Sequence, residues 1–256
     1  MLLLKKIESY KKYFDINNNI KNYVEMFPLK VKNLNLIIEN QKLINNLNFQ
    51  LNDSSLTVLL GPNGAGKSLL LRLLNGLLVP TSGQIFWSGN CINDSIRKKQ
   101  AFVFQKSILL RRSVSENLNF VQKLYNCSNG SNQDEMLKMV GLYDKKNIPA
   151  RLLSVGEQQI LSLIRALIIN PQLILLDEPT SNIDPISTSI IESILFAAKE
   201  KGVKIIFVTH DILQAKRIAD EILFMGKGSI IEQNKVKLFF PKPKTKVAQN
   251  FISGKI

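Results

Sequence analysis

The segment from Gly61 to Ser68 reads Gly-Pro-Asn-Gly-Ala-Gly-Lys-Ser and has the residue types of a phosphate-binding loop. Its glycines allow the backbone to curl until several N–H groups face one anion, and the helix expected after it adds partial positive charge there. The ammonium group of Lys67 can reach the β- and γ-phosphates of a nucleotide, and the hydroxyl of Ser68 is a ligand for Mg²⁺. A buried strand before the loop and a helix after it are the context that this motif requires. The sequence therefore predicts a site for a nucleoside triphosphate.

A second chemically capable pair, Asp177 and Glu178, ends the apolar run 173–176. Ligands of open α/β sheets bind at the carboxyl ends of strands, so we expect both acids to lie beside the loop. There Asp177 would hold Mg²⁺ and Glu178 would polarise the attacking water. A solvated turn is the alternative, and the position of the pair about 110 residues after the loop favours the functional interpretation.

The apolar pattern predicts the elements that must position these groups. Continuous apolar runs predict buried strands at 56–60, 101–104, 173–176, 203–208 and 221–225, the last of which we expect to end the sheet. Helical periodicity predicts helices at 67–78, 157–169 and 186–199. Strands that alternate with helices predict an α/β fold, a mostly parallel P-loop NTPase sheet flanked by helices.

Other segments predict how the chain is divided. Alternating apolar residues at 29–36 and 47–51 predict an antiparallel β subdomain around a turn at 39–41. It belongs to the domain over 28–232 that carries the phosphate-binding loop. Residues 107–160 are polar, lack a strand pattern and are expected to form a helical insertion. Residues 233–256 are expected to be a tail packed on the domain. Residues 1–27 could be a docking helix, a floppy tail or translation from an upstream start codon, and we favour the last two.

The charge is high and lies mostly near the two ends. The 256 residues carry 34 Lys and Arg against 20 Asp and Glu, a formal net charge of +14. Six lysines and three acids give the first 30 residues +3, and seven lysines and one acid give the last 30 residues +6. No dense arginine stripe or aromatic ladder accompanies this charge, so we interpret it as lysine-rich solvated surface. A weak preference for an anionic membrane surface is the second interpretation, and we expect no nucleic-acid partner.

Composition excludes several classes of protein. Hydrophobic residues make up 45% of the chain, too many for a wholly disordered protein. The two cysteines, Cys91 and Cys127, exclude a disulfide framework and a multi-cysteine zinc site. The apolar stretch 69–79 is broken by Arg72 and Asn75 and is shorter than the ~18–20 residues that span a bilayer. The first lysines follow a very short apolar run, the reverse of a secretory signal. We therefore expect a soluble protein of a reducing compartment.

Further motifs, together with the loop and the two acids, resemble the nucleotide-binding subunits of ABC transporters over about residues 29–227. Phe-Val-Phe-Gln at 102–105 is similar to the glutamine loop, and Leu-Ser-Val-Gly-Glu-Gln-Gln at 153–159 is similar to the signature sequence. Residues 179–184 resemble the D-loop, and Val-Thr-His-Asp at 208–211 resembles the switch-histidine segment. The ordered set is far more specific than any one motif, because a lone histidine or glutamine is usually structural.

The resemblance implies an ATPase that acts as a head-to-tail dimer and buries two ATP molecules, each between the loop of one chain and the signature sequence of the other. The catalytic residues that it implies are Lys67, Gln105, Glu178 and His210. The implied Mg²⁺ ligands are Ser68, Gln105 and Asp177. The implied nucleotide contacts are Ile38, Gly61, Pro62, Asn63, Gly64, Ala65, Gly66, Lys67, Ser68, Leu69, Ser154, Gly156 and Asp184. Because the partner presents a helix N-terminus to the γ-phosphate, closure of the dimer depends on that phosphate. Hydrolysis removes its charge and lets the two chains separate.

The sequence departs from the family pattern at four positions near the nucleotide. Val155 replaces the first glycine of the signature pair, and its β-branched side chain is expected to crowd the γ-phosphate and to disfavour a positive φ. Leu69 replaces a second hydroxyl residue, Ile38 replaces the aromatic residue that stacks on adenine, and Ile160 replaces a basic residue. We therefore expect a slow ATPase with a relaxed preference among nucleotide bases.

The absence of a membrane span implies, by the same resemblance, that the transmembrane permease is a separate polypeptide and that a substrate-binding protein acts through it. The segments 214–221, 239–241 and 251–254 resemble the tail of importer ATPases for small oxyanions such as tungstate and phosphate; importers of polar amino acids are the alternative. We expect a peripheral protein on the cytoplasmic face of the cell membrane. The groove beside Gln105 and the segment 106–117 are expected to receive a helix of the permease, with a plain surface loop as the alternative.

Three rival functions remain open at this point. A soluble ABC-type ATPase usually carries a coiled-coil insertion or two fused ATPase domains, which this sequence lacks. A P-loop kinase would leave the signature-like segment, Asp184 and His210 without a role. A binding module without catalysis is opposed by Glu178 and His210, while Val155 and Leu69 keep this alternative open. ATP turnover and co-purification with a membrane protein distinguish these cases.

Overall fold

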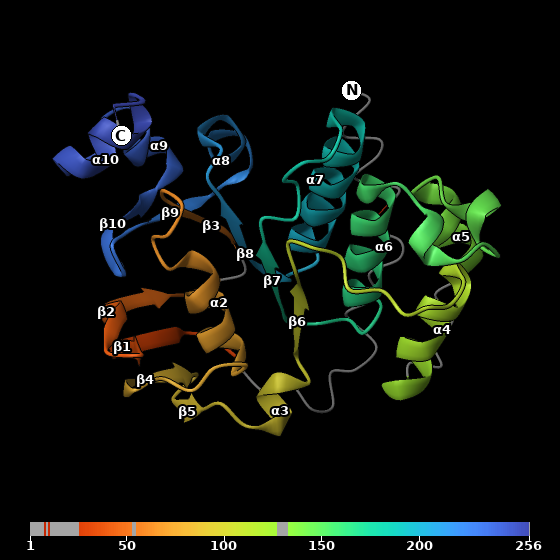
Figure 1. Cartoon of the computed structure of the whole chain (residues 1–256), viewed down its shortest axis with the longest axis horizontal. Coiled ribbons are helices and arrows are strands. Elements are labelled where there is room, and N and C mark those ends of the chain that lie inside the picture. Colours follow the sequence, from red (N-terminus) through yellow and green to blue (C-terminus); the bar gives the residue numbers. More distant parts are fainter. Residues whose placement is uncertain (1–7, 9, 11–25, 53–54, 127–132, 256) are drawn as a thin grey trace.

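The continuous apolar runs form a six-stranded sheet in the computed structural model, which describes residues 8, 10, 26–52, 55–126 and 133–255 (Figure 1). In sheet order the strands are β10 (Ser229–Lys235), β9 (Glu221–Gly226), β3 (Leu56–Leu60), β8 (Lys204–Thr209), β7 (Leu173–Asp177) and β6 (Gln100–Val103). The pairs from β9 to β6 are parallel, and only β10 pairs antiparallel with β9. The expected mostly parallel sheet is confirmed.

A smaller antiparallel sheet covers one end of the molecule. Its strands, in order, are β2 (Gln41–Leu51), β1 (Leu29–Ile38), β4 (Ser82–Trp87) and β5 (Asn90–Cys91). The hairpin β1–β2 turns at Glu39 and Asn40, both of which have a positive φ, as the polar turn predicts. This sheet is the expected antiparallel subdomain.

Helices cover the strands and extend the other end of the molecule, where α4 and α5 lie (Figure 1). The helices are α2 (Lys67–Asn75), α3 (Asp94–Arg97), α4 (Val114–Leu124), α5 (Gln133–Met139), α6 (Val155–Leu167), α7 (Pro185–Glu200), α8 (Ile212–Ile218), α9 (Val236–Phe239) and α10 (Lys246–Ile252), with 3-10 helices at Tyr143–Lys145 and Ala150–Leu152. In the described part of the segment 107–160, helices and loops are present, and the β pairing is limited to one isolated bridge between Ser113 and Pro149. Its status as a separate insertion stays a prediction.

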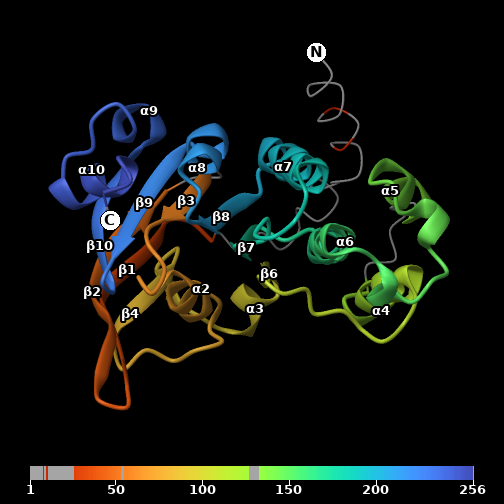
Figure 2. The same cartoon turned by 45° about the horizontal axis from the view of Figure 1, so that its top comes forward.

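Alternate residues of the parallel strands enter two different cores, one on each face of the sheet. In β7, Leu173 and Leu175 pack with α2, whereas Ile174 and Leu176 pack with α6 and α7. Figures 1 and 2 show β6 and β7 between α2 and α6. The helix that follows the phosphate-binding loop and the helix that follows the signature sequence therefore lie on opposite faces of one sheet.

Several boundaries differ from the predictions. The sheet does not end with β9, because Gly226–Lys227–Gly228 turns the chain back into β10. The strands β4 and β5 were not anticipated, since Gly83 and Gly89 interrupt their pattern. The helix α2 ends at Asn75 instead of residue 78, because Gly76 adopts the left-handed conformation (φ 77°) and donates to the carbonyl of Leu73.

Both ends of the described chain pack on the two cores. Phe239 of α9 is fully buried, and the ring of Phe251 lies 5.3 Å from that of Phe224. Of the extension, Tyr10 is buried in the core with α6 and Met26 in the core with α2. The other expectations for 1–25, and Cys127, lie outside the described residues. β10 runs through residue 232, and the division at that residue stays a prediction. Within the described ranges, no helix has the length and apolarity to cross a bilayer.

Candidate nucleotide-binding and catalytic site

The phosphate-binding loop connects the carboxyl end of β3 to the N-terminus of α2, the context that the motif requires. Gly61 passes so close to β9 that a Cβ at this position would lie 2.1 Å from the carbonyl oxygen of Met225. Gly66 is the N-cap of α2 with a φ of 97°, a left-handed conformation that disfavours a side chain. Both glycines are therefore needed for the backbone path that aims N–H groups at an anion.

Lys67 is buried at the first position of α2, with its side chain 5% exposed. Its ammonium group donates to the carbonyl oxygens of Gly61 (2.8 Å) and Pro62 (2.9 Å), so it is held across the mouth of the loop. Burial lowers the pKa of Lys67, while the charges of Glu178 and Asp177 oppose that shift.

Ser68 and Asp177 meet at the point predicted for Mg²⁺. The Ser68 hydroxyl donates to Oδ1 of Asp177 over 2.7 Å, and burial raises the pKa of this carboxyl despite the hydrogen bond. Hydroxyl and carboxylate oxygens are ligands that Mg²⁺ accepts in octahedral geometry together with phosphate and water oxygens. Among the described residues no group of three His, Cys, Asp or Glu side chains forms a metal site of its own. The donor set thus fits a cation shared with phosphate.

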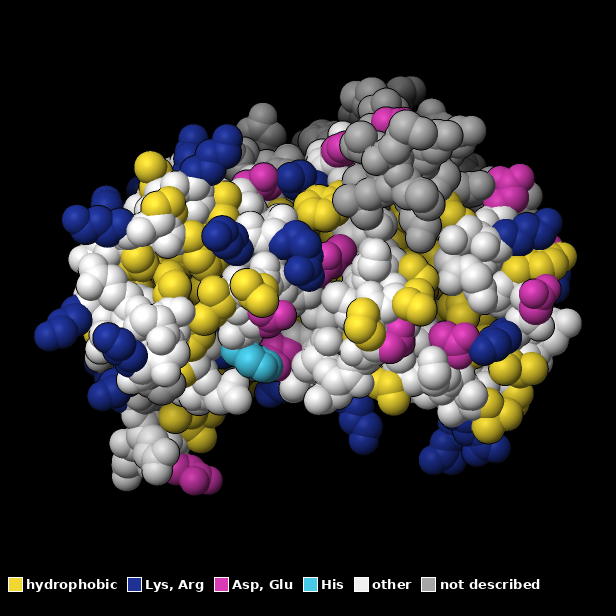
Figure 3. Space-filling view, turned by 90° about the horizontal axis from the view of Figure 1, so that it is seen from above, with side chains coloured by type: hydrophobic (Ala, Val, Ile, Leu, Met, Phe, Trp, Pro, Cys, Tyr) yellow, Lys and Arg dark blue, Asp and Glu magenta, His cyan; other side chains and the backbone are white. Residues whose placement is uncertain are grey.

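Glu178 lies between two of the predicted catalytic side chains. Its Oε1 is 3.3 Å from Nδ1 of His210, and its Oε2 accepts from Nε2 of Gln105 over 3.3 Å. The Glu178 side chain is 14% exposed and that of His210 is 51% exposed. Figure 3 shows the single histidine of the chain at the surface beside acidic side chains. A carboxylate held in this way can orient and polarise a water molecule.

Strand register explains why residues distant in sequence converge. Leu60 of β3 pairs with Thr209 of β8, and Asp177 of β7 pairs with Val208. The loops after β3, β6, β7 and β8 therefore leave the same edge of the sheet, as parallel pairing requires. The structure brings together Lys67, Ser68, Gln105, Asp177, Glu178 and His210 at this edge.

The signature sequence forms the N-terminus of α6. Ser154 is the N-cap: its hydroxyl accepts from the N–H of Glu157 (3.3 Å), and Glu157 accepts from the N–H of Ser154 (3.0 Å). Ser154 and Val155 are exposed, whereas Gly156 is buried. Val155 is the first residue of α6 and has no positive φ, so the expected backbone penalty does not apply; its side chain, 61% exposed, projects outward.

Gly156 packs against the N-terminus of α7. Asp184 caps α7 by accepting from the N–H (2.8 Å) and hydroxyl (2.6 Å) of Ser187, and these bonds lower the pKa of Asp184. A Cβ at position 156 would lie 2.2 Å from Oγ of Ser187 and 2.9 Å from Oδ2 of Asp184. Gly156 and Asp184 are thus neighbours within one chain.

The remaining departures from the family pattern have ordinary places in the fold. Leu69 is partly buried against the core with α2, and Ile160 is 2% exposed in the core with α6. Ile38 ends β1 at the tip of the hairpin, where it is 42% exposed and pairs with Gln41. Among the described residues, no hydrogen bond joins Ile38 to the phosphate-binding loop.

The sequence interpretation missed two residues that organise the site. The side-chain amide of Gln159 in α6 donates to the backbone carbonyl oxygens of Phe104 (3.3 Å) and Gln105, so it ties the glutamine loop to the signature helix. The hydroxyl of Ser181 donates to the carbonyl of Glu178 over 2.9 Å and accepts from Gln105 over 3.4 Å. Gln159 lies in the signature-like segment 153–159 and Ser181 in the D-loop-like segment 179–184, so their places in these motifs were the sequence signal for a role at the site.

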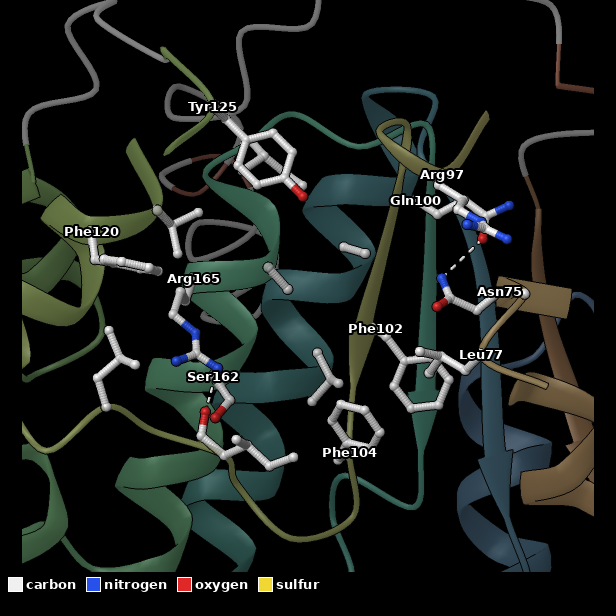
Figure 4. A pocket seen from close by; sticks show the side chains of 18 residues that line it. Asn75, Leu77, Arg97, Gln100, Phe102, Phe104, Phe120, Tyr125, Ser162 and Arg165 are labelled. Carbon is white, nitrogen blue, oxygen red and sulfur yellow. Dashed lines mark hydrogen bonds between the residues drawn. The ribbon is translucent and has the colours of Figure 1, made fainter. Parts of the chain in front are cut away.

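A groove of about 510 Å³ lies beside the glutamine loop, between α2, β6, α4 and α6 (Figure 4). Phe102, Phe104 and Phe120 give it an apolar surface, and Arg165 reaches into it from α6. The guanidinium of Arg165 donates to the carbonyl of Ile108, and burial lowers its pKa. Ile108 itself is 59% exposed.

Comparison with known proteins finds an ABC transporter family model and relatives of one kind, named as phosphate import ATP-binding proteins. The family model described as ABC transporter matches residues 44–181. Phosphate import ATP-binding protein PstB of Campylobacter jejuni is 34% identical over 241 residues, covering 88% of this chain and 98% of the relative. The protein of the same name from Malacoplasma penetrans is 37% identical over 248 residues, covering 89% and 86%.

Solved structures resemble the fold over most of the chain. CbiO1 from Clostridium perfringens, described as part of the ABC transporter complex cbiONQ, has a TM-score of 0.74 at 29% identity and covers 85% of this chain and 92% of its own. The ATP-binding cassette MJ0796, solved as a dimer in a post-hydrolysis state with ADP and Pi, has a TM-score of 0.73 at 27% identity and covers 82% and 100%.

Proposed function

The chain belongs to the ABC transporter family, and we propose that it is the subunit whose ATP hydrolysis powers an importer for a small anion such as phosphate. As a family member it is an ATPase. The importer and its cargo are inferred from the relatives named for phosphate import, which match nearly the whole chain at 34% and 37% identity. Tungstate is the second oxyanion consistent with the tail sequence.

The observation that carries the catalytic assignment is the position of Glu178. Its carboxylate is held by Gln105 and His210 at the same sheet edge as the Ser68–Asp177 pair. A base must lie within hydrogen-bond reach of the water it activates and close to the bond that breaks. Glu178 is the carboxylate that has these contacts, and 14% of its side chain stays exposed to water.

Binding and charge stabilisation are assigned to the loop. The backbone N–H groups of 61–68 and the N-terminus of α2 attract the phosphates, and Lys67 turns its ammonium group from the loop carbonyls to the terminal phosphates. Ser68 and Asp177 would hold Mg²⁺. The third ligand that we propose, the Gln105 side-chain amide, now donates to Glu178, which directly follows Asp177. The ion, when bound, screens the charge that develops on the transferred phosphoryl group.

The dimer is proposed from the arrangement of the two helix N-termini. α2 and α6 lie on opposite faces of one sheet, so Ser154 and Gly156 reach a nucleotide most directly in the loop of a second copy. Two such contacts close a head-to-tail dimer, with Asp184 beside Gly156 in the interface. Loss of the γ-phosphate removes the charge that holds the interface together.

The groove beside Gln105 is proposed to receive a cytoplasmic helix of the transmembrane permease. Its aromatic residues, the exposed Ile108 and the adjacent glutamine loop support this docking, because movement of the loop would then reach the nucleotide. The protein would lie at the cytoplasmic face of the membrane, and a substrate-binding protein would act through the permease. Ile108→Asp should abolish membrane association; unchanged association would exclude this surface.

The experiment that tests the assignment combines turnover with self-association. The parent chain should hydrolyse ATP in the presence of Mg²⁺, and Glu178→Gln should bind ATP without hydrolysis and sediment as a dimer. A Glu178→Gln chain that hydrolyses ATP at the parental rate would contradict the catalytic assignment. Cargo is tested in proteoliposomes with the co-purifying permease and binding protein, where phosphate should stimulate turnover and glutamine should not.

A further inference from the structure

The turn that carries Glu178 has a backbone conformation that needs external support. Glu178 has a φ of 45°, a left-handed value that is unfavourable for a residue with a Cβ and persists only where surrounding contacts fix it. One support is local: the N–H (3.1 Å) and hydroxyl (2.9 Å) of Ser181 both donate to the carbonyl of Glu178.

A second support reaches the turn from a different element. The hydroxyl of Thr180, two residues after Glu178, donates to Oε1 of Gln214 over 3.1 Å. Gln214 lies in α8, and its side chain is 3% exposed. The helix α8 starts at Ile212, and its N-cap Asp211 directly follows His210. This hydrogen bond therefore joins the segment of Glu178 to the helix that follows His210.

The orientation of the Gln214 amide is set by a buried carboxylate. Its Nε2 donates to Oε1 of Glu192 over 2.9 Å, and Glu192 is 8% exposed in α7. An ionised carboxylate only accepts hydrogen bonds, so Gln214 must present its NH₂ group to Glu192 and its carbonyl oxygen to Thr180. Arg217 supplies the matching charge through Nε (2.9 Å) and Nη2 (2.6 Å) to the same carboxylate.

We propose that Thr180, Gln214, Glu192 and Arg217 form a positioning relay that sets the geometry between Glu178 and His210. Each member acts through its neighbour: Arg217 fixes Glu192, Glu192 orients Gln214, and Gln214 holds the Thr180 turn. The relay joins the loop after β7, which carries Glu178, to α8, which follows His210. It therefore fixes the two segments whose side chains make the 3.3 Å contact between Glu178 and His210. The inference rests on the catalytic role proposed for Glu178 and extends it to residues that touch no nucleotide.

The first test uses a matched pair at position 180. Thr180→Val keeps the shape of the side chain and removes its donor, whereas Thr180→Ser keeps the donor. In single-turnover hydrolysis by the full-length chain we expect Thr180→Val to be about tenfold slower and Thr180→Ser to stay within about twofold of the parent. Equilibrium binding of a fluorescent ATP analogue should change by less than about twofold in both, because the loop 61–68 is untouched.

The second test asks whether the two bonded residues act as one unit. Gln214→Met keeps the length of the side chain and removes both of its hydrogen bonds, so it should lower the rate by a similar factor. The double variant Thr180→Val/Gln214→Met should be no slower than the slower single variant, since both remove the same link. Multiplication of the two factors would show independent effects and would overturn the relay.

The results also separate this inference from the proposed function. If Thr180→Val hydrolyses at the parental rate while Glu178→Gln is inactive, the relay is wrong and the catalytic assignment stands. If Thr180→Val binds ATP more weakly and melts at a lower temperature in addition to hydrolysing more slowly, the role of Thr180 is structural and the inference is overturned. If Glu178→Gln keeps the parental rate, the proposed function itself fails.

Discussion

The phosphate-binding loop at the start of α2 and the signature sequence at the start of α6 both place Ser and Gly at a helix N-terminus. They differ in the side chains that contact them. At the edge, polar groups meet within the chain: Lys67 bonds the loop carbonyls, Ser68 bonds Asp177, and Glu178 lies between two neighbours. At the signature helix the capping bonds are internal, while Ser154 and Val155 face outward.

The difference follows from the position of the two helices on opposite faces of the sheet. α2 packs with Leu173 and Leu175, and α6 packs with Ile174 and Leu176, so the two helices belong to different cores on opposite faces. One chain brings its own acids and loop together, whereas we propose that the exposed signature end completes the site of a second copy. Variants that change only one of the two regions therefore test this difference.

The largest effect is expected at the phosphate-binding edge. Glu178→Gln removes the charge that we propose polarises the attacking water, so it should lower kcat by at least about a hundredfold, with ATP affinity within about threefold of the parent. Glu200→Gln, a matched change at the end of α7, should leave the rate unchanged. Steady-state hydrolysis and nucleotide binding measure both; an equal loss of rate in the two variants would remove the special role of Glu178.

The next effect is expected where the signature helix meets α7. Gly156→Ala places a methyl group 2.2 Å from Oγ of Ser187, so the two helix ends must move apart. We expect ATP-driven dimerisation and hydrolysis to fall by about tenfold or more, while ATP still binds the loop. Sedimentation and binding measurements separate these outcomes.

A compensating change at position 187 tests the same contact. Ser187→Gly in the Gly156→Ala background removes the clashing side chain and should restore part of the dimerisation. Gly226→Ala is the matched control, since its added methyl group would meet its first neighbour only at 3.4 Å. Loss of ATP binding by Gly156→Ala would contradict the separation of the two regions.

A smaller effect is expected from the outward side chain of the signature helix. Val155→Gly removes a β-branched group that is 61% exposed at the start of α6, and we expect hydrolysis by the full complex to rise about two- to fivefold. Because Val155 already has a helical backbone, the gain would come from room for the γ-phosphate and not from φ. An unchanged rate would show that the crowding argument is wrong.

The smallest effect is expected at the hairpin tip. Ile38→Tyr supplies a face on which a purine can stack and should tighten ATP binding by about two- to fourfold. The parent chain should bind ATP and GTP with similar affinity, and the variant should distinguish purines from pyrimidine nucleotides. Competition binding measures this; a strong base preference in the parent would exclude Ile38 as the adenine contact.

The sequence predicted those parts of the fold and site whose signals are local. β3, β7 and β8 are continuous apolar runs, and the residues of the phosphate-binding loop are consecutive, so both are visible without the structure. β4 and β10 were missed because glycine turns and adjacent polar residues weaken their alternation.

The contacts that support the site were harder to anticipate. Thr180, Glu192 and Gln214 lie on three different elements, and their bonds depend on how α7 and α8 pack on the sheet. The contact of Gly156 with Ser187 likewise depends on the approach of two helices. No spacing rule along the chain predicts such packing, because it is determined by tertiary structure.

The central claim is that the two regions meet between copies of the chain, and a structure of the ATP-loaded Glu178→Gln dimer tests it most directly. The account predicts that Ser154 and Gly156 of one copy contact the γ-phosphate of ATP held by residues 61–68 of the other. A loaded structure in which these two residues face away from every bound ATP would contradict it.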